Sequence, residues 1–284
     1  MMRTILVLAA IFVAQDPTAS WSPATPLQGS LVRVAVPAAA LPDDTTTPAG
    51  SLAGEPLHFG RDAAGGWTAL AAVPLAATDS VVLWLRGPGG DSVGLRVPVA
   101  LRPTGVDRLT IDSTFTQPLD SALAERVRRE TARVVASLWS SHERPRLWTE
   151  PFRPPRPTRV TSPFGRGRSY NAADVRGRHR GTDFAGDRGD PVRAANRGVV
   201  VLADTLFFAG RSIYVDHGAG VVTAYLHLDR SSVAEGDTVA RGQVIGRVGA
   251  TGRVTGPHLH WAAFFGRVVF DPLDLLALDP RAIP

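Results

Sequence analysis

Turn-forming residues limit the possible folds of this chain more than any other feature. Its 284 residues include 28 glycines and 23 prolines, spread along the whole length. Proline cannot continue a helix, and glycine inside a helix or strand weakens it. The pattern therefore favours many short strands joined by turns over long helices. Apolar residues make up 44% and charged residues 20% of the chain, which excludes global disorder and a collagen-like fold.

Two residue types are missing altogether. Without cysteine the chain has no disulfide, thiolate nucleophile, cysteine-ligated zinc or iron–sulfur cluster. Without lysine all 31 basic residues are arginine, and the formal net charge is +5 at pH 7. That charge is compatible with anionic polymers of a cell envelope. No array of aromatic residues for base stacking accompanies it, so we expect no nucleic-acid partner.

The start of the chain is typical of an export signal. Met1, Met2 and Arg3 precede an apolar run from Thr4 to Ala14. This run is too short to span a membrane as a stable helix, and it fits a secretory signal peptide. We predict a signal peptide over residues 1–19, with the cleavage position left open. The mature protein is then expected in the periplasm or cell envelope, without stable membrane insertion.

Three patterns follow one another before the middle of the chain. Residues 20–118 contain short alternating apolar runs at 30–36, 67–73, 81–85 and 94–101, which predict a small β-sandwich. Residues 119–142 change to helical spacing, with Asp120 as a plausible N-cap, and predict one amphipathic helix. Residues 143–157 are rich in proline and arginine and predict a stiff linker.

The C-terminal part, 158–284, is expected to form an all-β domain. Its predicted strands lie at 198–203, 212–216, 221–227, 243–248 and 258–264, separated by glycine-containing turns. The whole chain is thus predicted to be mainly β, with a sandwich, a connecting helix and a second β domain.

Histidines concentrate in this C-terminal part. His179 and Asp183 are four residues apart, and His258 and His260 are two apart, so the latter pair should face one side of a strand. Tyr225 and His227 are also two apart and should share a face by the same rule. Two imidazoles and one carboxylate suit a catalytic zinc ion, which takes three protein ligands and leaves a fourth position open.

Several motifs in this part occur in the order of a known family. The segments HRGTDFAG, VDHGAG, AYLHL, GDTVARGQVIGRVGATG and TGPHLHW resemble the lysostaphin-type (LytM-like) zinc metallopeptidases that cut peptidoglycan peptides. The resemblance covers about 158–276. It implies one Zn²⁺ held by His179, Asp183 and His260, with His227 and His258 as catalytic histidines that do not bind the metal.

The resemblance and the residues together give a functional hypothesis. A free histidine can take a proton from water or stabilise an oxyanion, and we assign His258 to the first role and His227 to the second, although sequence alone does not separate them. Tyr225 and Asn171 are candidates for substrate binding. The segments 165–178 and 206–211 depart from the family pattern and are expected to flank the substrate groove.

The expected function is that of an exported zinc endopeptidase acting on stem or cross-link peptides of peptidoglycan, and a monomer is expected. Two alternatives stay open: a non-catalytic regulator that activates a cell-wall amidase, and a zinc peptidase with a protein substrate. The motifs do not specify the bond that is cut. The N-terminal sandwich resembles the accessory domain found before some of these catalytic domains, and either targeting or covering of the groove fits it.

Overall fold

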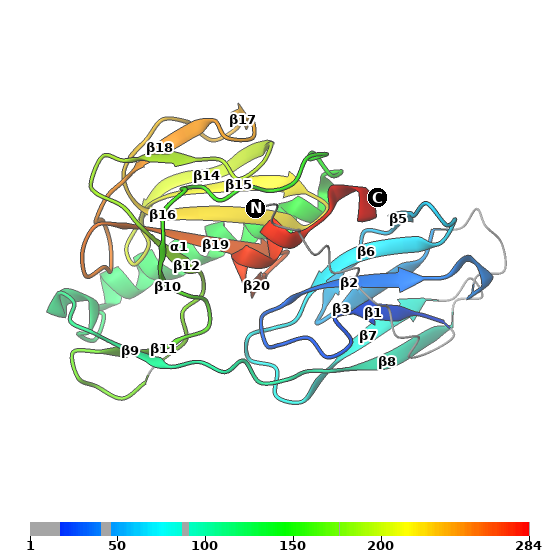
Figure 1. The fold of residues 1–284 in the computed structure, drawn as a ribbon. Helices are drawn as coiled ribbons and strands as arrows, with labels where there is room; N and C mark the ends of the chain where they lie inside the picture. Colours follow the sequence, from blue (N-terminus) through cyan, green and yellow to red (C-terminus); the bar gives the residue numbers. More distant parts are fainter. Residues whose placement is uncertain (1–17, 41–46, 87–90, 176, 284) are drawn as a thin grey trace, which may run out of the picture.

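The structure is a computed structural model that describes residues 18–40, 47–86, 91–175 and 177–283 (Figure 1). It is mainly β, with one α-helix among these residues, so the predicted fold class is confirmed. The predicted signal peptide falls almost entirely on residues 1–17, which lie outside the described residues. Within the described part of the chain, no helix has the length and apolar character needed to cross a membrane.

The N-terminal part forms two four-stranded sheets that share one core. Val34, Leu83 and Val97 are fully buried between them. One sheet has the order β1 (Ser20–Ser22), β2 (Leu31–Val36), β6 (Trp67–Ala72), β5 (Gly60–Arg61). The other has the order β4 (Glu55–Pro56), β3 (Ala49–Leu52), β7 (Ser80–Arg86), β8 (Ser92–Pro98).

The C-terminal part is built around one large sheet. Its path runs through β10 (Val160–Ser162), β12 (Thr182–Ala185), β19 (His258–Phe265), β16 (Val221–Ser231), β15 (Gly210–Gly218), β14 (Gly198–Leu206) and β17 (Thr238–Val239). Three further strands join this path at its sides: β13 (Pro191–Arg193), β18 (Val244–Val248) and β20 (Val268–Phe270). All strand pairs in the sheet are antiparallel.

The segment between these two parts lies against the C-terminal sheet. Strand β9 (Val106–Leu109) pairs in parallel with β11 (Gly167–Tyr170). Helix α1 (Ser121–Trp139) follows, and the carboxylate of Asp120 caps it by accepting the N–H of Leu123 at 2.8 Å. Only Leu138 of the helix is buried, because much of its apolar stripe faces a cavity rather than packed side chains. The 3₁₀ helices are η1 (Ala38–Ala40), η2 (Ser113–Phe115), η3 (Ser140–Glu143), η4 (Pro272–Ala277) and η5 (Pro280–Ala282).

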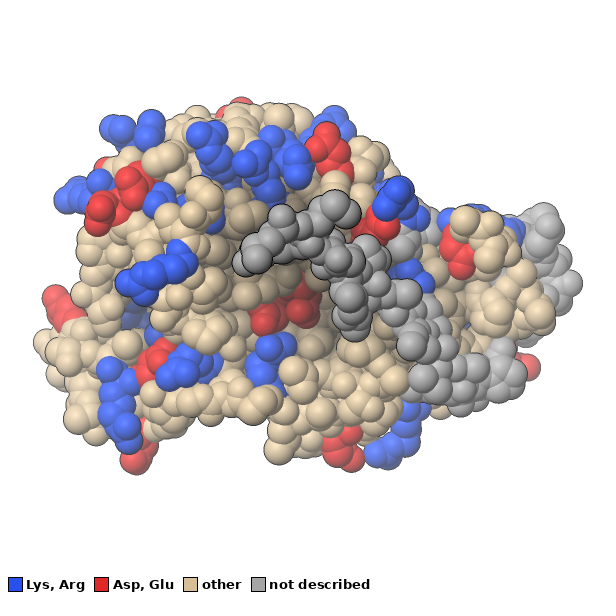
Figure 2. Space-filling model, viewed as in Figure 1, with Lys and Arg blue, Asp and Glu red and all other residues tan. Residues whose placement is uncertain are grey.

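The remaining connections hold the parts together. Trp148 and Phe152, in the proline-rich segment 143–157, are buried, so this segment packs against the C-terminal sheet rather than crossing open solvent. At the contact between the sandwich and the C-terminal tail, Leu31 donates its N–H to Asp274 at 2.8 Å, and Arg102 pairs with Asp271 at 3.0 Å. Arginines line the upper edge of the C-terminal part in Figure 2, with fewer acidic side chains between them.

Candidate metal centre

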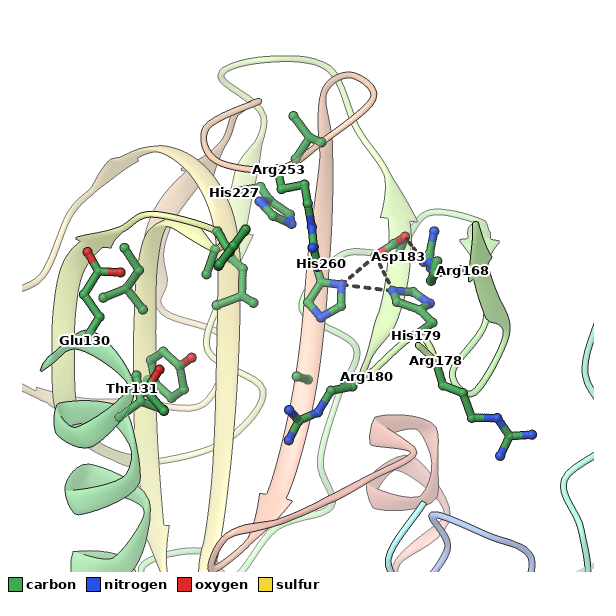
Figure 3. A pocket seen from close by; sticks show the side chains of 18 of the residues that line it. Glu130, Thr131, Arg168, Arg178, His179, Arg180, Asp183, His227, Arg253 and His260 are labelled. Carbon is green, nitrogen blue, oxygen red and sulfur yellow. Dashed lines mark hydrogen bonds and ion pairs between the residues drawn. The ribbon is translucent and has the colours of Figure 1, made fainter. Parts of the chain in front are cut away.

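Three side chains converge at one end of the C-terminal sheet. The antiparallel register places Asp183 of β12 opposite His260 of β19, and His179 lies just before β12. His179 Nε2 is 3.0 Å from Asp183 Oδ1 and 3.0 Å from His260 Nδ1, and His260 Nδ1 is 2.8 Å from the same carboxylate oxygen (Figure 3). The residues that the resemblance names as ligands therefore form one compact cluster.

The protons around His179 indicate that a cation fits this cluster. Its Nδ1 is 2.9 Å from the carbonyl of Pro163, which can only accept, so the ring proton lies there and Nε2 presents a lone pair. This lone pair and the Asp183 carboxylate are both acceptors and repel one another unless a proton or cation lies between them. Ligands at 2.0–2.1 Å from a tetrahedral zinc ion lie about 3.3 Å apart. The observed separations need only a few tenths of an ångström of opening.

The aspartate has a second, buried partner. Arg168 donates to Oδ2 of Asp183 at 3.2 Å, and its other nitrogen is 3.4 Å from Asp107 in β9. Burial alone would raise the pKa of Asp183, but a proton that His179 or His260 places between itself and the carboxylate, with the charge it brings, holds the pKa well below its usual range. Arg168 thus fixes the oxygen of Asp183 that does not face the histidines. Sequence reasoning missed Arg168 and Asp107, because nothing in the motifs links two segments about 60 residues apart.

The two other histidines are held by backbone carbonyls. His227 Nδ1 lies 2.8 Å from the carbonyl of Thr251, and His258 Nδ1 lies 2.8 Å from that of Gly256. Both rings therefore carry a proton on Nδ1 when neutral and leave Nε2 as an acceptor. Nε2 of His258 is 3.7 Å from Asp183 Oδ1. The ring centroids of His227 and His258 are 5.2 Å apart. Burial, together with the neighbouring His260 and His258, lowers the pKa of His227 to about 3.

Residues two apart on a strand face the same side in β19, as expected, but not in β16. His258 and His260 both line the cavity, as expected of residues two apart. On β16, by contrast, the consecutive residues Leu226 and His227 both line it, whereas Tyr225 does not. The cause is a β-bulge: three residue steps on β16 oppose two on β15, and His227 has a left-handed φ of 63°. The expectation that Tyr225 and His227 share a face is therefore wrong.

Tyr225 and Asn171, the two candidates for substrate binding, both lie outside the cavity. Tyr225 is fully buried in the core, where its hydroxyl accepts the N–H of Ala195 at 2.7 Å. Asn171 forms hydrogen bonds of 2.9 and 3.1 Å with the N–H and carbonyl of Ile111, so it extends the pairing of β9 with β11. Neither side chain lines the cavity. Asn171 instead supports the position of Ile111, which does.

A cavity of about 440 Å³ extends from the group of His179, Asp183 and His260 along the sheet. Its floor comes from β15, β16 and β19, one wall from α1, and another from Leu109 and Ile111 beside β11. Tyr170 and Phe208, from the two segments that depart from the family pattern, also line it, as predicted. Arg253 lies between these two rings, 4.7 and 4.9 Å from their centroids. The cluster is thus the end of a lined groove, not an isolated surface group.

Comparison with known proteins agrees with this geometry. Residues 177–272 match peptidase family M23. The chain is 44% identical over 103 residues to the peptidoglycan DD-endopeptidase ShyC of Vibrio cholerae, a match that covers 36% of this chain and 24% of ShyC. It is 31% identical to the catalytic domain of the antimicrobial peptidase lysostaphin from Staphylococcus simulans, over 43% of this chain and 93% of that domain, with a TM-score of 0.38.

One solved structure matches nearly the whole chain. A crystal structure assigned to peptidase M23 from Pseudomonas aeruginosa aligns with 89% of this chain and 96% of its own, with 27% identity and a TM-score of 0.68. That alignment extends beyond the 177–272 match to most of the described fold. The curated relatives are longer proteins, and the chain spans about a quarter of their length.

Proposed function

The chain belongs to peptidase family M23, and from this premise we propose that it is a zinc-dependent endopeptidase that hydrolyses peptide bonds in peptidoglycan stem or cross-link peptides. The observation that carries the proposal is the convergence of four histidines and Asp183 at the end of a peptide-sized cavity. His179, Asp183 and His260 would hold the metal. A zinc ion with one open position would polarise the carbonyl of the scissile bond and lower the pKa of a bound water to about 7.

The chain's own histidines supply the proton transfers. We assign His258 as the general base, because its Nδ1 is held by the carbonyl of Gly256 and its Nε2 faces Asp183, where a proton taken from the attacking water would be stabilised by the carboxylate. His227 faces the same space from β16, and we assign it to the developing oxyanion. Since burial keeps its ring neutral at rest, that role requires Nε2 to gain a proton during the reaction.

The proposed substrate and location rest on the names of relatives and on the sequence. The names of the curated relatives indicate peptidoglycan, and an excess of arginine favours an anionic polymer. The apolar stretch from Thr4 to Ala14 supports export to the periplasm or cell envelope. We further propose that the protein acts as a monomer, which size-exclusion chromatography with light scattering would test.

Metal content and cleavage test the proposal together. The chain from Ser20 onward is purified, its zinc is quantified, and it is incubated with peptidoglycan with and without a chelator, with products identified by mass spectrometry. We expect about one zinc per protein, peptide cleavage that the chelator stops, and product masses that identify the bond. Full zinc occupancy without cleavage of peptidoglycan would refute the proposed activity.

Single substitutions separate ligands from catalytic groups. His179→Ala and Asp183→Ala are expected to lose both zinc and hydrolysis. His258→Ala and His227→Ala are expected to lose hydrolysis and keep zinc. A His258→Ala protein that has lost its zinc would overturn the assignment of the ligands.

A further inference from the structure

Five arginines line the cavity, and four of them have partners. Arg168 pairs with Asp183 and Asp107, and Arg267 pairs with Glu55 at 2.9 Å. Arg178 donates to the side chain of Gln28 at 2.6 Å, and Arg253 lies against two aromatic rings. Arg180 differs from these four. Within the described part of the chain it makes no hydrogen bond, ion pair or ring contact.

The side chain of Arg180 is directed into the cavity. In Figure 3, Arg178 and Arg180 leave the two sides of His179 in different directions: Arg178 points away from the cluster, and Arg180 points across β19 towards the floor of the cavity. Arg180 is exposed, so its guanidinium is open to a ligand. Its position directly after His179 keeps it close to the reacting centre.

A second polar group on the cavity floor also lacks a partner. Tyr214 of β15 is only 5% exposed, and its hydroxyl forms no hydrogen bond among the described residues. Its ring stacks on Phe264, with centroids 6.2 Å apart, which fixes its orientation. Burial raises the pKa of Tyr214 to about 12, while the charge of Arg180 acts in the opposite direction. The phenol therefore keeps its proton and can donate it in a hydrogen bond.

The residues between these two groups are small. The sheet register places Tyr214 opposite Ala224 on β16, and Ala224 opposite Ala262 on β19. Because both alanines have small side chains, the floor of the cavity stays open between β12 and the phenol of Tyr214. Among the described residues, Asp183 and Glu130 are the carboxylates that line the cavity, and Glu130 already binds Arg126 at 2.7 Å and the N–H of Phe207 at 2.8 Å. The free charge in the cavity is therefore positive.

We propose that Arg180 and Tyr214 form a carboxylate-binding subsite, through which this peptidase selects peptides that carry an acidic side chain or a free α-carboxylate near the scissile bond. A guanidinium matches a carboxylate with two parallel hydrogen bonds, and a phenol can add a third. Because Arg180 follows His179 in the chain, the carboxylate would lie about one to two residues of extended peptide from the scissile bond. This inference rests on the proposed function.

The test compares one substrate with and without its negative charge. The probe is one cross-linked muropeptide, used as the free acid and after conversion of its carboxylates to carboxamides. The full zinc-loaded protein is assayed as wild type, Arg180→Gln and Tyr214→Phe. Arg230→Gln is the matched control, since Arg230 is exposed, lies outside the cavity and carries the same charge.

The expected result is a loss of binding that depends on the carboxylate. For the free acid, Arg180→Gln should raise KM about 10- to 100-fold and Tyr214→Phe about 3- to 10-fold, because a hydrogen bond to a charged group is stronger than a neutral one. Both variants should cleave the carboxamide as the wild type does, with unchanged zinc content. Equal losses on both probes, or equal cleavage of both by the wild type, would overturn the subsite.

A binding measurement separates this inference from the proposed activity. In the His258→Ala background, which is expected to keep zinc without cleaving, calorimetry measures the affinity for the free acid directly. Tighter binding of the free acid than of the carboxamide, weakened by Arg180→Gln, supports the subsite even if the wild type cleaves neither probe. Equal affinity for the free acid and the carboxamide in this background would refute the subsite, whichever bond the enzyme hydrolyses.

Discussion

A single methyl group at Gly181 is expected to displace His260, one of the proposed metal ligands. The added Cβ of Gly181→Ala would lie 2.5 Å from Nε2 of His260 and 2.6 Å from the carbonyl oxygen of Trp261, where ordinary contacts begin at 3.4 Å. One side or the other must move by about 0.8–0.9 Å. Trp261 is fully buried, so β19 resists the movement and the His260 ring takes much of it.

The expected magnitudes follow from that displacement. Overpacking of a core typically costs about 1–3 kcal/mol, which lowers the melting temperature of a protein of this size by about 2–10 °C. Zinc sites tolerate about 0.2 Å in ligand distance, so a ligand moved several times further should weaken zinc binding at least about 100-fold.

The assay separates the two effects and includes a matched control. Thermal unfolding in chelator reports the packing cost alone, and competition with a chromophoric chelator reports zinc affinity. Gly177→Ala adds the same methyl group four residues earlier, where nothing lies within 4 Å, and should change neither quantity. Wild-type zinc affinity in Gly181→Ala would refute the reasoning, since it would mean that the strand accommodates the methyl group without moving His260.

Three further predictions address the support of the site. Arg168→Met leaves the carboxylates of Asp183 and Asp107 without their shared partner. It should weaken zinc binding about 10- to 100-fold, measured by chelator competition, and Arg168→Lys should recover part of that affinity. Unchanged zinc affinity in Arg168→Met would exclude a positioning role for Arg168. Burial lowers the pKa of His217 to about 4 from 6.5 in the unfolded chain, so its contribution to stability is complete above pH 6.5 and is lost as the pH falls towards 4, by about 2 kcal/mol at pH 5. Chemical denaturation from pH 7.5 to 5 should show this loss, and His217→Gln should show a flatter profile. Zinc at 100 times its Kd should stabilise the wild type by about 2.7 kcal/mol, and a similar gain in His260→Ala would place the bound ion elsewhere.

The sequence predicted those features that depend on local pattern. Alternation and turn residues located the main strands to within a few residues, because each strand has a buried face. The motifs also named His179, Asp183 and His260, which the register of β12 and β19 brings together. Among the predicted site residues, the alternation rule failed at the left-handed His227, where the backbone departs from regular pleating.

Features that depend on distant segments could not be predicted. Arg168 and Asp107 meet only because β9 pairs in parallel with β11, and no local pattern specifies that pairing. Helical spacing did predict α1, but not that its apolar stripe would line a cavity instead of a closed core. From the sequence Asn171 is a candidate for substrate binding, and its pairing with the backbone of Ile111 is visible only in the fold.

The division between the matched region and the cavity has a consequence for specificity. Residues 177–272 contain the three proposed metal ligands, both other histidines, Arg180 and Tyr214, whereas α1 and β9, which contribute to the cavity wall, lie outside that region. The groups proposed to act on a peptide bond are therefore encoded together, whereas part of the cavity wall is encoded by the preceding segment. Since Asp107 of β9 also holds Arg168 behind Asp183, that segment supports a proposed metal ligand as well as the cavity wall. A change in α1 or β9 should therefore alter which peptide fits while leaving the chemistry in place, unless it disturbs Asp107, where fit and metal geometry are coupled.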